Sequence, residues 1–267
     1  MINLALCGIG RAGIEVIRSA RETGNFKVVA AFCRIGSEKK GKDIGLISNM
    51  SESGIYATEI TEAERVFNNT KIDVAIDFSN PAASRMLLNA CKNHGVPAVI
   101  CTTGFTDDEL DSMIKLAFGH KLGIVYAPNV TLGINVLMSV LKTVTRAFPF
   151  FDYQITEIHH SKKFDIPSGT AKRIADTLER ELPTDRIPIN SVRAGGYIGV
   201  HEVMAAGESE RISISHESFS RKAFAQGALT AAEYIRDKRG WHYMEDVLDI
   251  KSMLEAASEP GARISRA

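Results

Sequence analysis

The sequence predicts an α/β protein with two domains, a first domain built on a parallel sheet and a second domain of α+β type. Three observations support this prediction. The chain opens with a short apolar segment, a glycine-rich loop and a helical pattern. Apolar strand-like segments then alternate with helical segments as far as about residue 130, which is typical of a parallel sheet. Beyond that point polar and apolar residues alternate, which indicates strands with one exposed face.

The N-terminal segment contains a dinucleotide-binding motif in the required context of strand, turn and helix. Residues 2–7 are mostly apolar, residues 8–13 have GxGxxG spacing, and apolar residues at helical spacing follow. In this motif the glycines allow a tight turn, close approach of a pyrophosphate, and packing of the helix on the strand. The motif predicts a Rossmann-like domain, and a plain glycine turn is the alternative. The expected cofactor-binding residues are Gly8, Ile9, Gly10, Arg11, Ala12 and Gly13.

The end of the second predicted strand indicates which nicotinamide cofactor binds. An NAD-specific site usually carries Asp or Glu there to bind the ribose 2′-hydroxyl, whereas this chain has Cys33 and Arg34. An arginine can pair with a 2′-phosphate, and Arg11, Lys39 and Lys40 could add positive charge. We therefore expect NADPH to be preferred and NADH to be accepted. In the alternative interpretation Arg34 stacks on the adenine and both cofactors bind.

Three further strand-like segments, residues 73–78, 98–101 and 123–126, end in polar loops. Ligands of parallel sheets bind at the carboxyl ends of the strands, so we expect the nicotinamide near the last two of these loops. The cofactor-binding residues expected there are Cys101, Thr102, Thr103, Ala127, Pro128, Asn129 and Val130.

The change of pattern divides the chain near residue 130. We expect residues 1–129 to form the dinucleotide-binding domain, with residues 237–267 returning to it. Residues 130–236 are expected to form a substrate-binding and oligomerisation domain. Within this second part the patterns predict helices over residues 133–147 and 225–238 and strands near residues 191–193, 200–203 and 211–216.

The composition excludes several classes of protein. Lys and Arg number 32 and Asp and Glu number 32, and this zero net charge argues against nucleic acid or a membrane as the main partner. No apolar run is long enough to span a membrane. The N-terminus runs straight into a strand, so no signal peptide is expected. The four cysteines form no CxxC pair, which favours free thiols in a reducing compartment, and we expect a cytoplasmic protein.

Residues 157–171, EIHHSKKFDIPSGTA, combine an acid–base group and a cation just ahead of a helical pattern. His159 is the candidate general acid or base, and Lys163 lies four residues later. Lys162 is interpreted as a solvated charge. A metal site is the rival interpretation of the two histidines. However, adjacent residues at a strand end point to opposite faces, and no Cys or HExxH partner stands nearby, so we expect no metal.

The same segment predicts an anion-binding helix start. Ser168 or Thr170 can cap the helix, and Gly169 lets a ligand approach the backbone. The free N–H groups and the partial positive charge of a first helical turn bind a carboxylate or a phosphate. We therefore expect an anionic substrate to bind at Ser168, Gly169 and Thr170, with Lys163 beside it.

On these residues the chain resembles the 4-hydroxy-tetrahydrodipicolinate reductase family, also called dihydrodipicolinate reductase. The family signature runs Glu-x-His-His, then Lys, then Asp-Ala-Pro-Ser-Gly-Thr-Ala. It is matched here by Glu157, His159, His160, Lys163, Asp165, Pro167, Ser168, Gly169, Thr170 and Ala171. Further matches in order are residues 77–79, 102–104, Ala127, 129–133, Asn135, Arg193, Gly195, Gly199, His201, His216, 220–221, 224–225 and 227–228.

The resemblance implies NAD(P)H-dependent reduction of a cyclic dicarboxylate, 4-hydroxy-tetrahydrodipicolinate, with loss of water, in lysine and diaminopimelate biosynthesis. It implies that His159 is the general acid or base and that Lys163 donates a proton and binds substrate. It also implies that His160, Gly169 and Thr170 hold the substrate carboxylates, and that the protein is a homotetramer joined through the second domain's sheet. The alternatives are a related enzyme acting on another imine or diamino acid, and a relative that keeps the fold without turnover.

Overall fold

The computed structural model describes residues 1–184, 186–250 and 252, and these fall largely into two compact units. The first unit contains Met1–Thr131 and Phe224–Asp249, and the second contains Leu132–Ala223 together with the described residues Ile250 and Ser252. The returning segment starts at Phe224 rather than at residue 237, because the apolar face of helix α8 (Lys222–Ile235) packs within the first unit, where Gly227 lies against the backbone of Val130. The part of the expected return at residues 251 and 253–267 lies outside the described residues.

The first unit contains a seven-stranded parallel sheet in the order β11-β6-β5-β4-β1-β2-β3, so the parallel sheet expected from the sequence is confirmed. The strand order reverses between β1 and β4, which is where doubly wound sheets bind ligands. The strands are β1 Ile2–Cys7, β2 Phe26–Cys33, β3 Thr58–Glu59, β4 Val74–Asp77, β5 Ala98–Ile100, β6 Gly123–Tyr126 and β11 Gly240–His242.

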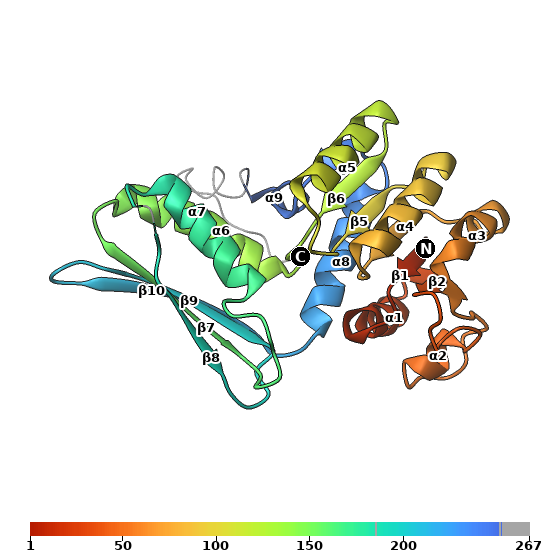
Figure 1. Cartoon of the computed structure of the whole chain (residues 1–267), viewed down its shortest axis with the longest axis horizontal. Helices are drawn as coiled ribbons and strands as arrows, with labels where there is room; N and C mark the ends of the chain where they lie inside the picture. The colour runs from red at the N-terminus through yellow and green to blue at the C-terminus, as the bar shows by residue number, and fades with distance from the viewer. Residues whose placement is uncertain (185, 251, 253–267) are drawn as a thin grey trace, which may run out of the picture. The chain divides into compact units, whose positions relative to one another are not determined.

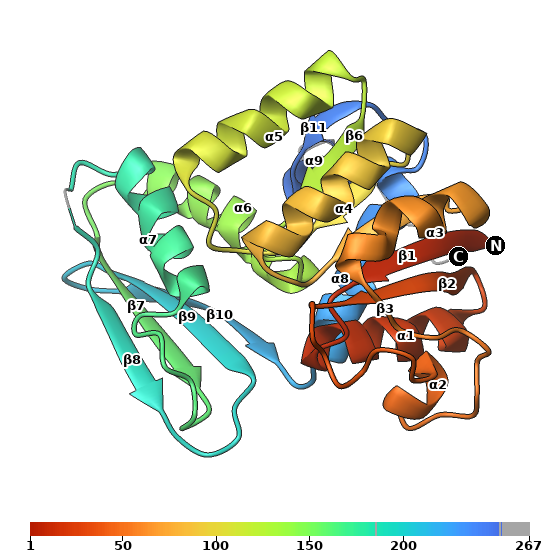
Figure 2. The same cartoon turned by 45° about the vertical axis from the view of Figure 1, so that its right-hand side comes forward.

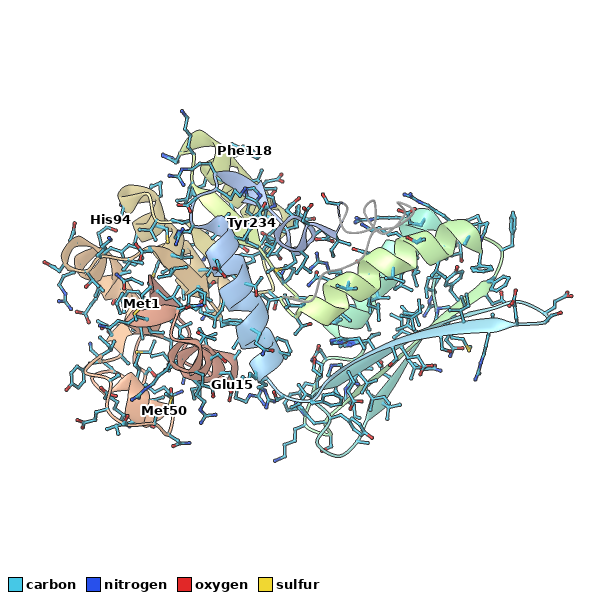
Figure 3. The ribbon with its side chains drawn as sticks, turned by 180° about the vertical axis from the view of Figure 1, so that it is seen from behind. Met1, Glu15, Met50, His94, Phe118 and Tyr234 are labelled. Atoms are coloured by element: carbon cyan, nitrogen blue, oxygen red, sulfur yellow. The ribbon has the colours of Figure 1, made fainter. Side chains whose placement is uncertain are left out.

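Helices cover both faces of this sheet, as parallel strands require. Figure 2 shows α3, α4 and α5 on one face, and Figure 3 looks onto the other face, where Glu15 and Tyr234 mark α1 and α8. The buried side chains of Phe32, Leu87 and Ile100 belong to the core under α3–α5. The remaining helices of this unit are α1 Arg11–Thr23, α2 Ile44–Ile47, α3 Ala63–Asn69 after the 3-10 turn Ile60–Glu62, α4 Pro81–His94, α5 Asp107–Gly119 and α9 Met244–Leu248.

The second unit contains a four-stranded sheet in the order β10-β9-β7-β8, in which β7 and β8 are parallel and the other pairs are antiparallel. Two helices, α6 (Leu132–Ala147) and α7 (Gly169–Glu181), lie together over one face, and no other described helix of this unit covers the sheet (Figure 1). The three strands expected in this region are confirmed, and each is longer than expected. The strands are β7 Asp152–His159, β8 Ile189–Arg193, β9 Gly199–Ala206 and β10 Arg211–Ser218.

The core of the second unit lies between its sheet and its two helices and includes Leu141, Ile155 and Ile174. Within the part of the chain that the structure describes, no helix combines the length and the apolar character needed to cross a membrane.

Candidate active site

The glycine loop after β1 is closed on its protein side and open on its outer side. Gly8 has a φ of +93°, and a Cβ on it would lie 2.3 Å from the carbonyl oxygen of Phe78. A Cβ on Gly13 would lie 2.0 Å from the carbonyl oxygen of Gly8. In contrast, Gly10 has no atom within 4 Å of its Cβ position, and it precedes α1 without a capping side chain. The loop can therefore accept a pyrophosphate at the N-terminus of α1.

A pocket of about 320 Å³ adjoins this loop. Four of the expected cofactor residues line this pocket, namely Gly8, Ile9, Gly10 and Arg34. The loop after β2 adds Lys39, whose Nζ donates a hydrogen bond to the carbonyl oxygen of Ile9. The remaining lining residues are Cys7, Cys33, Ser37, Ser79, Asn80 and Ala83.

The other expected cofactor residues do not line this pocket. Arg11 and Thr103 are exposed, Ala12 and Pro128 are half-buried, and Gly13 packs beneath the loop. The remaining five are buried just beyond the ends of β5 and β6, namely Cys101, Thr102, Ala127, Asn129 and Val130. Thr102 Oγ1 accepts a hydrogen bond of 2.9 Å from the backbone N–H of Ser79, so it joins the ends of β5 and β4.

A buried carboxylate organises the end of β4, and its role was not predicted from the sequence. Asp77 is fully buried, accepts a hydrogen bond of 3.1 Å from the backbone N–H of Ser79, and also binds the hydroxyls of Ser79 and Ser84. Burial raises the pKa of Asp77. These hydrogen bonds fix the turn at Phe78, against which the glycine loop packs.

The second unit brings four polar side chains together on the helix-covered face of its sheet. Glu157 on β7 is in register with His201 on β9, and His159 on β7 is in register with Arg193 on β8. Glu157 is fully buried, and His159 and His201 are buried. His159 Nδ1 hydrogen bonds with Glu157 Oε2, while Arg193 Nη2 donates to Glu157 Oε1 at 2.6 Å.

The predicted helix start is joined to this cluster. Ser168 is the N-cap of α7, and its Oγ accepts a hydrogen bond of 3.1 Å from the backbone N–H of Ala171. The same Oγ lies 3.2 Å from His201 Nε2, and the backbone N–H of Ser168 donates to Glu157 Oε1 at 3.3 Å. Gly169 is exposed and has no atom within 4 Å of its Cβ position, and Thr170 is half-buried beside it. The first turn is therefore exposed at Gly169, whose backbone N–H hydrogen bonds with the carboxylate of Asp165.

Lys163 and His160 lie on the loop between β7 and α7. Lys163 Nζ donates to both carboxylate oxygens of Asp165, at 2.7 and 2.8 Å. His160 is half-buried, and its backbone N–H donates to the carbonyl oxygen of Tyr197 at 2.8 Å. Asp165 matches the family signature, but the sequence assigns it no role. The structure shows that it is the partner of Lys163.

The electrostatics of the cluster favour an ionised Glu157 beside a neutral His159. Burial alone would raise the pKa of Glu157, but hydrogen bonds from Arg193 and His159 hold this pKa below its usual range. Burial lowers the pKa of His159, and the contact with Glu157 opposes this effect only in part. Burial also lowers the pKa of His201, to about 3. An ionised carboxylate only accepts hydrogen bonds, so the His159 proton lies on Nδ1.

Ligand-type atoms of Glu157, His159 and His201 lie within 4.8 Å of one another, a spacing that could hold a metal ion. Both carboxylate oxygens of Glu157 already have partners, however, and one of these partners is the guanidinium of Arg193. A cation so close opposes the binding of a second cation. We therefore interpret the cluster as a proton-transfer group and assign no metal to it.

A Rossmann-like unit with an open glycine loop, together with a buried histidine–carboxylate pair in a second sheet unit, defines a nicotinamide-dependent oxidoreductase. Comparison with known proteins narrows this class. Family models described as dihydrodipicolinate reductase, N-terminus and C-terminus, match residues 2–130 and 133–248. The chain belongs to the dihydrodipicolinate reductase family.

Individual relatives agree with this assignment. The chain is 36% identical over 268 residues to the 4-hydroxy-tetrahydrodipicolinate reductase of Methanosarcina acetivorans, covering 94% of this chain and 100% of the relative. It is 31% identical over 272 residues to that of Methanocaldococcus jannaschii, covering 95% and 99%. A solved structure, dipicolinate-bound dihydrodipicolinate reductase from Paenisporosarcina sp. TG-14, matches with a TM-score of 0.76 and 28% identity over 91% of this chain and 97% of that one.

Proposed function

We propose that the protein is a 4-hydroxy-tetrahydrodipicolinate reductase, which uses NAD(P)H to reduce this cyclic dicarboxylate to tetrahydrodipicolinate in lysine and diaminopimelate biosynthesis. The observation that carries the proposal is the buried Glu157–His159 pair, which is hydrogen bonded to the start of helix α7. This pair would put the proposed acid–base group beside the proposed anion-binding turn within one unit. The names of the relatives and the dipicolinate bound in the Paenisporosarcina enzyme support this substrate class.

The first unit would hold the cofactor, which supplies a hydride when it is bound. Gly8, Gly10 and Gly13 form the loop for the pyrophosphate. The described residues that line the adjoining pocket include two cations, Arg34 and Lys39, and no carboxylate. A 2′-phosphate would pair with these cations, whereas a 2′-hydroxyl would not need them. We therefore propose that NADPH is preferred over NADH.

His159 would supply the proton that accompanies hydride transfer. Reduction of a conjugated imine places electrons on the substrate, and a nearby acid must neutralise the resulting charge. The absence of a side chain at Gly199 leaves room beside His159, because a Cβ there would lie 3.0 Å from His159 Nε2. The lowered pKa of His159 is compatible with this role, since a bound dicarboxylate would add negative charge that favours the protonated ring.

The substrate carboxylates would bind at the start of α7. The backbone N–H groups at Gly169 and Thr170 would receive one carboxylate, with Ser168 fixing the turn and with Lys163 and His160 adding positive or hydrogen-bonding groups. Lys163 is paired with Asp165 here, so a substrate carboxylate would compete with Asp165 for the ammonium group. Lys163 would also serve as a second proton donor.

The second unit's sheet supports a homotetramer. Its helix-free face presents apolar side chains such as Val192, which is 41% exposed, and Ile158, Val200 and Met204, which are partly exposed. A second copy of the chain would bury this face. The four buried cysteines without disulfides support a cytoplasmic location. Light scattering should give a particle with the mass of four 29.2 kDa chains.

The proposed activity can be tested with the product of dihydrodipicolinate synthase, generated in the same cuvette. Substrate-dependent oxidation of NADPH, followed by absorbance, is the expected result. Oxidation with other imines or diamino acids but not with this product would favour a related reductase or dehydrogenase. Binding of NADPH without turnover of any of them would indicate a relative that has lost its activity.

A further inference from the structure

The two carboxylate oxygens of Glu157 have different partners, and these partners belong to two different parts of the proposed site. Oε2 contacts Nδ1 of His159, and Oε1 accepts hydrogen bonds from Arg193 Nη2 at 2.6 Å and from the backbone N–H of Ser168 at 3.3 Å. Glu157 has no exposed surface. One buried side chain therefore contacts both the acid–base histidine and the N-cap of the substrate-binding helix.

Arg193 keeps this carboxylate charged. Its side chain is 11% exposed and pairs with Glu157 from the neighbouring strand β8, while a second hydrogen bond of 2.6 Å anchors it to the backbone carbonyl of Asp165. A buried carboxylate without such a partner would take up a proton and become a donor. With Arg193 in place, Glu157 can only accept from His159 Nδ1, which leaves Nε2 as the nitrogen that exchanges protons with a ligand.

We propose that Glu157 is a positioning residue that fixes the tautomer and the orientation of His159 and ties the ring to the carboxylate-binding turn at Ser168. The inference rests on the proposed function and extends it. When His159 releases a proton from Nε2, the remaining proton stays on Nδ1 and is hydrogen bonded to Glu157. Nε2 is then the nitrogen that takes up the next proton. The geometry also holds the acid at a fixed place relative to the bound carboxylate, which favours reaction over simple binding.

The charged and titratable groups near His159 come from the four strands of the sheet and from the loop after β7. Glu157 lies on β7, Arg193 on β8 and His201 on β9, and the ring centroids of His159 and His201 are 5.2 Å apart. Lys163 acts from the following loop, and His216 on β10 is in register with His201. Glu157 is the only carboxylate among these groups, so it is the group that favours a protonated His159.

The test is the variant Glu157→Gln, which keeps the size of the side chain and its carbonyl acceptor for Ser168 and Arg193 but turns an NH₂ group toward His159. The NH₂ group donates, so the neutral ring should change to the tautomer with its proton on Nε2. The protonated ring should also be disfavoured, and kcat at neutral pH should fall at least about tenfold. Inhibition by pyridine-2,6-dicarboxylate should change less than about threefold, because the turn at Ser168 is kept.

Ring ¹⁵N shifts of selectively labelled histidine report the tautomer without any turnover. The chain has seven histidines, and comparison with His159→Gln assigns the signal of His159. Glu208→Gln is the matched control, because Glu208 is an exposed carboxylate in the turn between β9 and β10, and it should change neither the ¹⁵N signal nor kcat.

If Glu157→Gln does not fold, the double variant Glu157→Gln with Arg193→Met removes the ion pair as a whole and leaves no buried charge unpaired. It should show the same change of tautomer. An Nδ1-protonated ring in the variant, or a wild-type pH profile and kcat, would overturn the inference. A wild-type protein that does not oxidise NADPH with the proposed substrate would overturn the proposed function instead, while the tautomer result would still stand.

Discussion

The candidate sites of the two units are formed by different parts of the chain, the backbone in the first unit and side chains in the second. In the first unit the proposed pyrophosphate site is formed mainly by backbone, namely the glycine loop, its turn at Phe78 and the N-terminus of α1. In the second unit the candidate site is formed by buried side chains. Glu157, His159, Arg193 and His201 come from three strands and meet on one face of a sheet.

This difference determines how each site should respond to mutation. A backbone site tolerates most side-chain changes and fails when a Cβ or a larger group fills its space. A site of buried side chains fails when one hydrogen-bonding partner is removed, because the remaining partners are left unpaired. The comparison predicts large catalytic effects in the second unit and selective binding effects in the first.

The largest effect is expected for His159→Gln. General acid catalysis contributes about 10²–10⁴-fold, so kcat should fall by that factor at saturating NADPH. The control is His120→Gln, an exposed histidine at the end of α5, which should retain wild-type kcat. If His159 only packs or binds ground-state substrate, KM will rise while kcat stays within about twofold, and Lys163 becomes the candidate acid.

Lys163→Ala should lower kcat/KM at least about tenfold, because a charge-assisted hydrogen bond contributes about 1.5–3 kcal/mol. The inhibition constant of pyridine-2,6-dicarboxylate should weaken in parallel. Lys162→Ala is the matched control, since Lys162 is exposed and adjacent. An unchanged inhibition constant in Lys163→Ala would mean that the carboxylate binds elsewhere. The side chains of the second unit would then not form the substrate site, as the comparison of the two units requires.

Arg34→Ala should weaken NADPH binding more than NADH binding, by roughly twofold to tenfold, since an exposed contact with a 2′-phosphate contributes about 0.5–1.5 kcal/mol. Lys39→Ala should act in the same direction. Lys40→Ala serves as the control, because Lys40 pairs with Glu59 and does not line the pocket. Equal loss for both cofactors, or a wild-type preference for NADH, would refute the 2′-phosphate role.

The smallest effect concerns the acid stability of the first unit. Burial alone would raise the pKa of Asp43, but hydrogen bonds from the backbone N–H groups of Ser53, Leu46 and Gly45 lower it to about 2. A lowered pKa stabilises the fold above the ordinary value of about 3.9, and this stabilisation is lost as the pH falls toward about 2. Asp43→Asn should therefore lower Tm by a few degrees above pH 4.

The difference between Asp43→Asn and wild type should vanish as the pH approaches 2, and differential scanning calorimetry can follow it. Asp111→Asn, an exposed residue of α5, is the control and should show no such dependence. A Tm difference for Asp43→Asn that is the same at every pH would mean that the carboxylate charge is not involved.

The sequence predicts the first site better than the second because its parts are local. The strand, the loop and the helix of residues 2–23 are consecutive, and their spacing alone indicates the turn. The short edge strand β11 has no such signal and was missed, because its place in the sheet depends on pairing with β6, far away in the chain.

In the second unit the sequence predicts roles for His159 and Lys163 and a helix cap at Ser168, and these three residues lie within one segment. The structure confirms the cap. The sequence did not assign roles to Arg193 or His201, which reach Glu157 and Ser168 over 36 and 33 residues of sequence. Only the pairing of β8 and β9 with β7 brings these side chains together. The alternation of the strands predicts which face each residue occupies but not its neighbour on the next strand.

The most direct test of the different roles proposed for the two units is the affinity for NADPH. It is measured by titration for wild type, Gly10→Val and His159→Gln. Gly10 has open space at its Cβ position, so valine should leave the fold intact while filling the place of the pyrophosphate. We predict that Gly10→Val weakens NADPH at least about tenfold and that His159→Gln leaves the affinity within about twofold while abolishing most turnover. Normal NADPH binding by Gly10→Val, or a loss of binding in His159→Gln as large as its loss of turnover, would contradict the account.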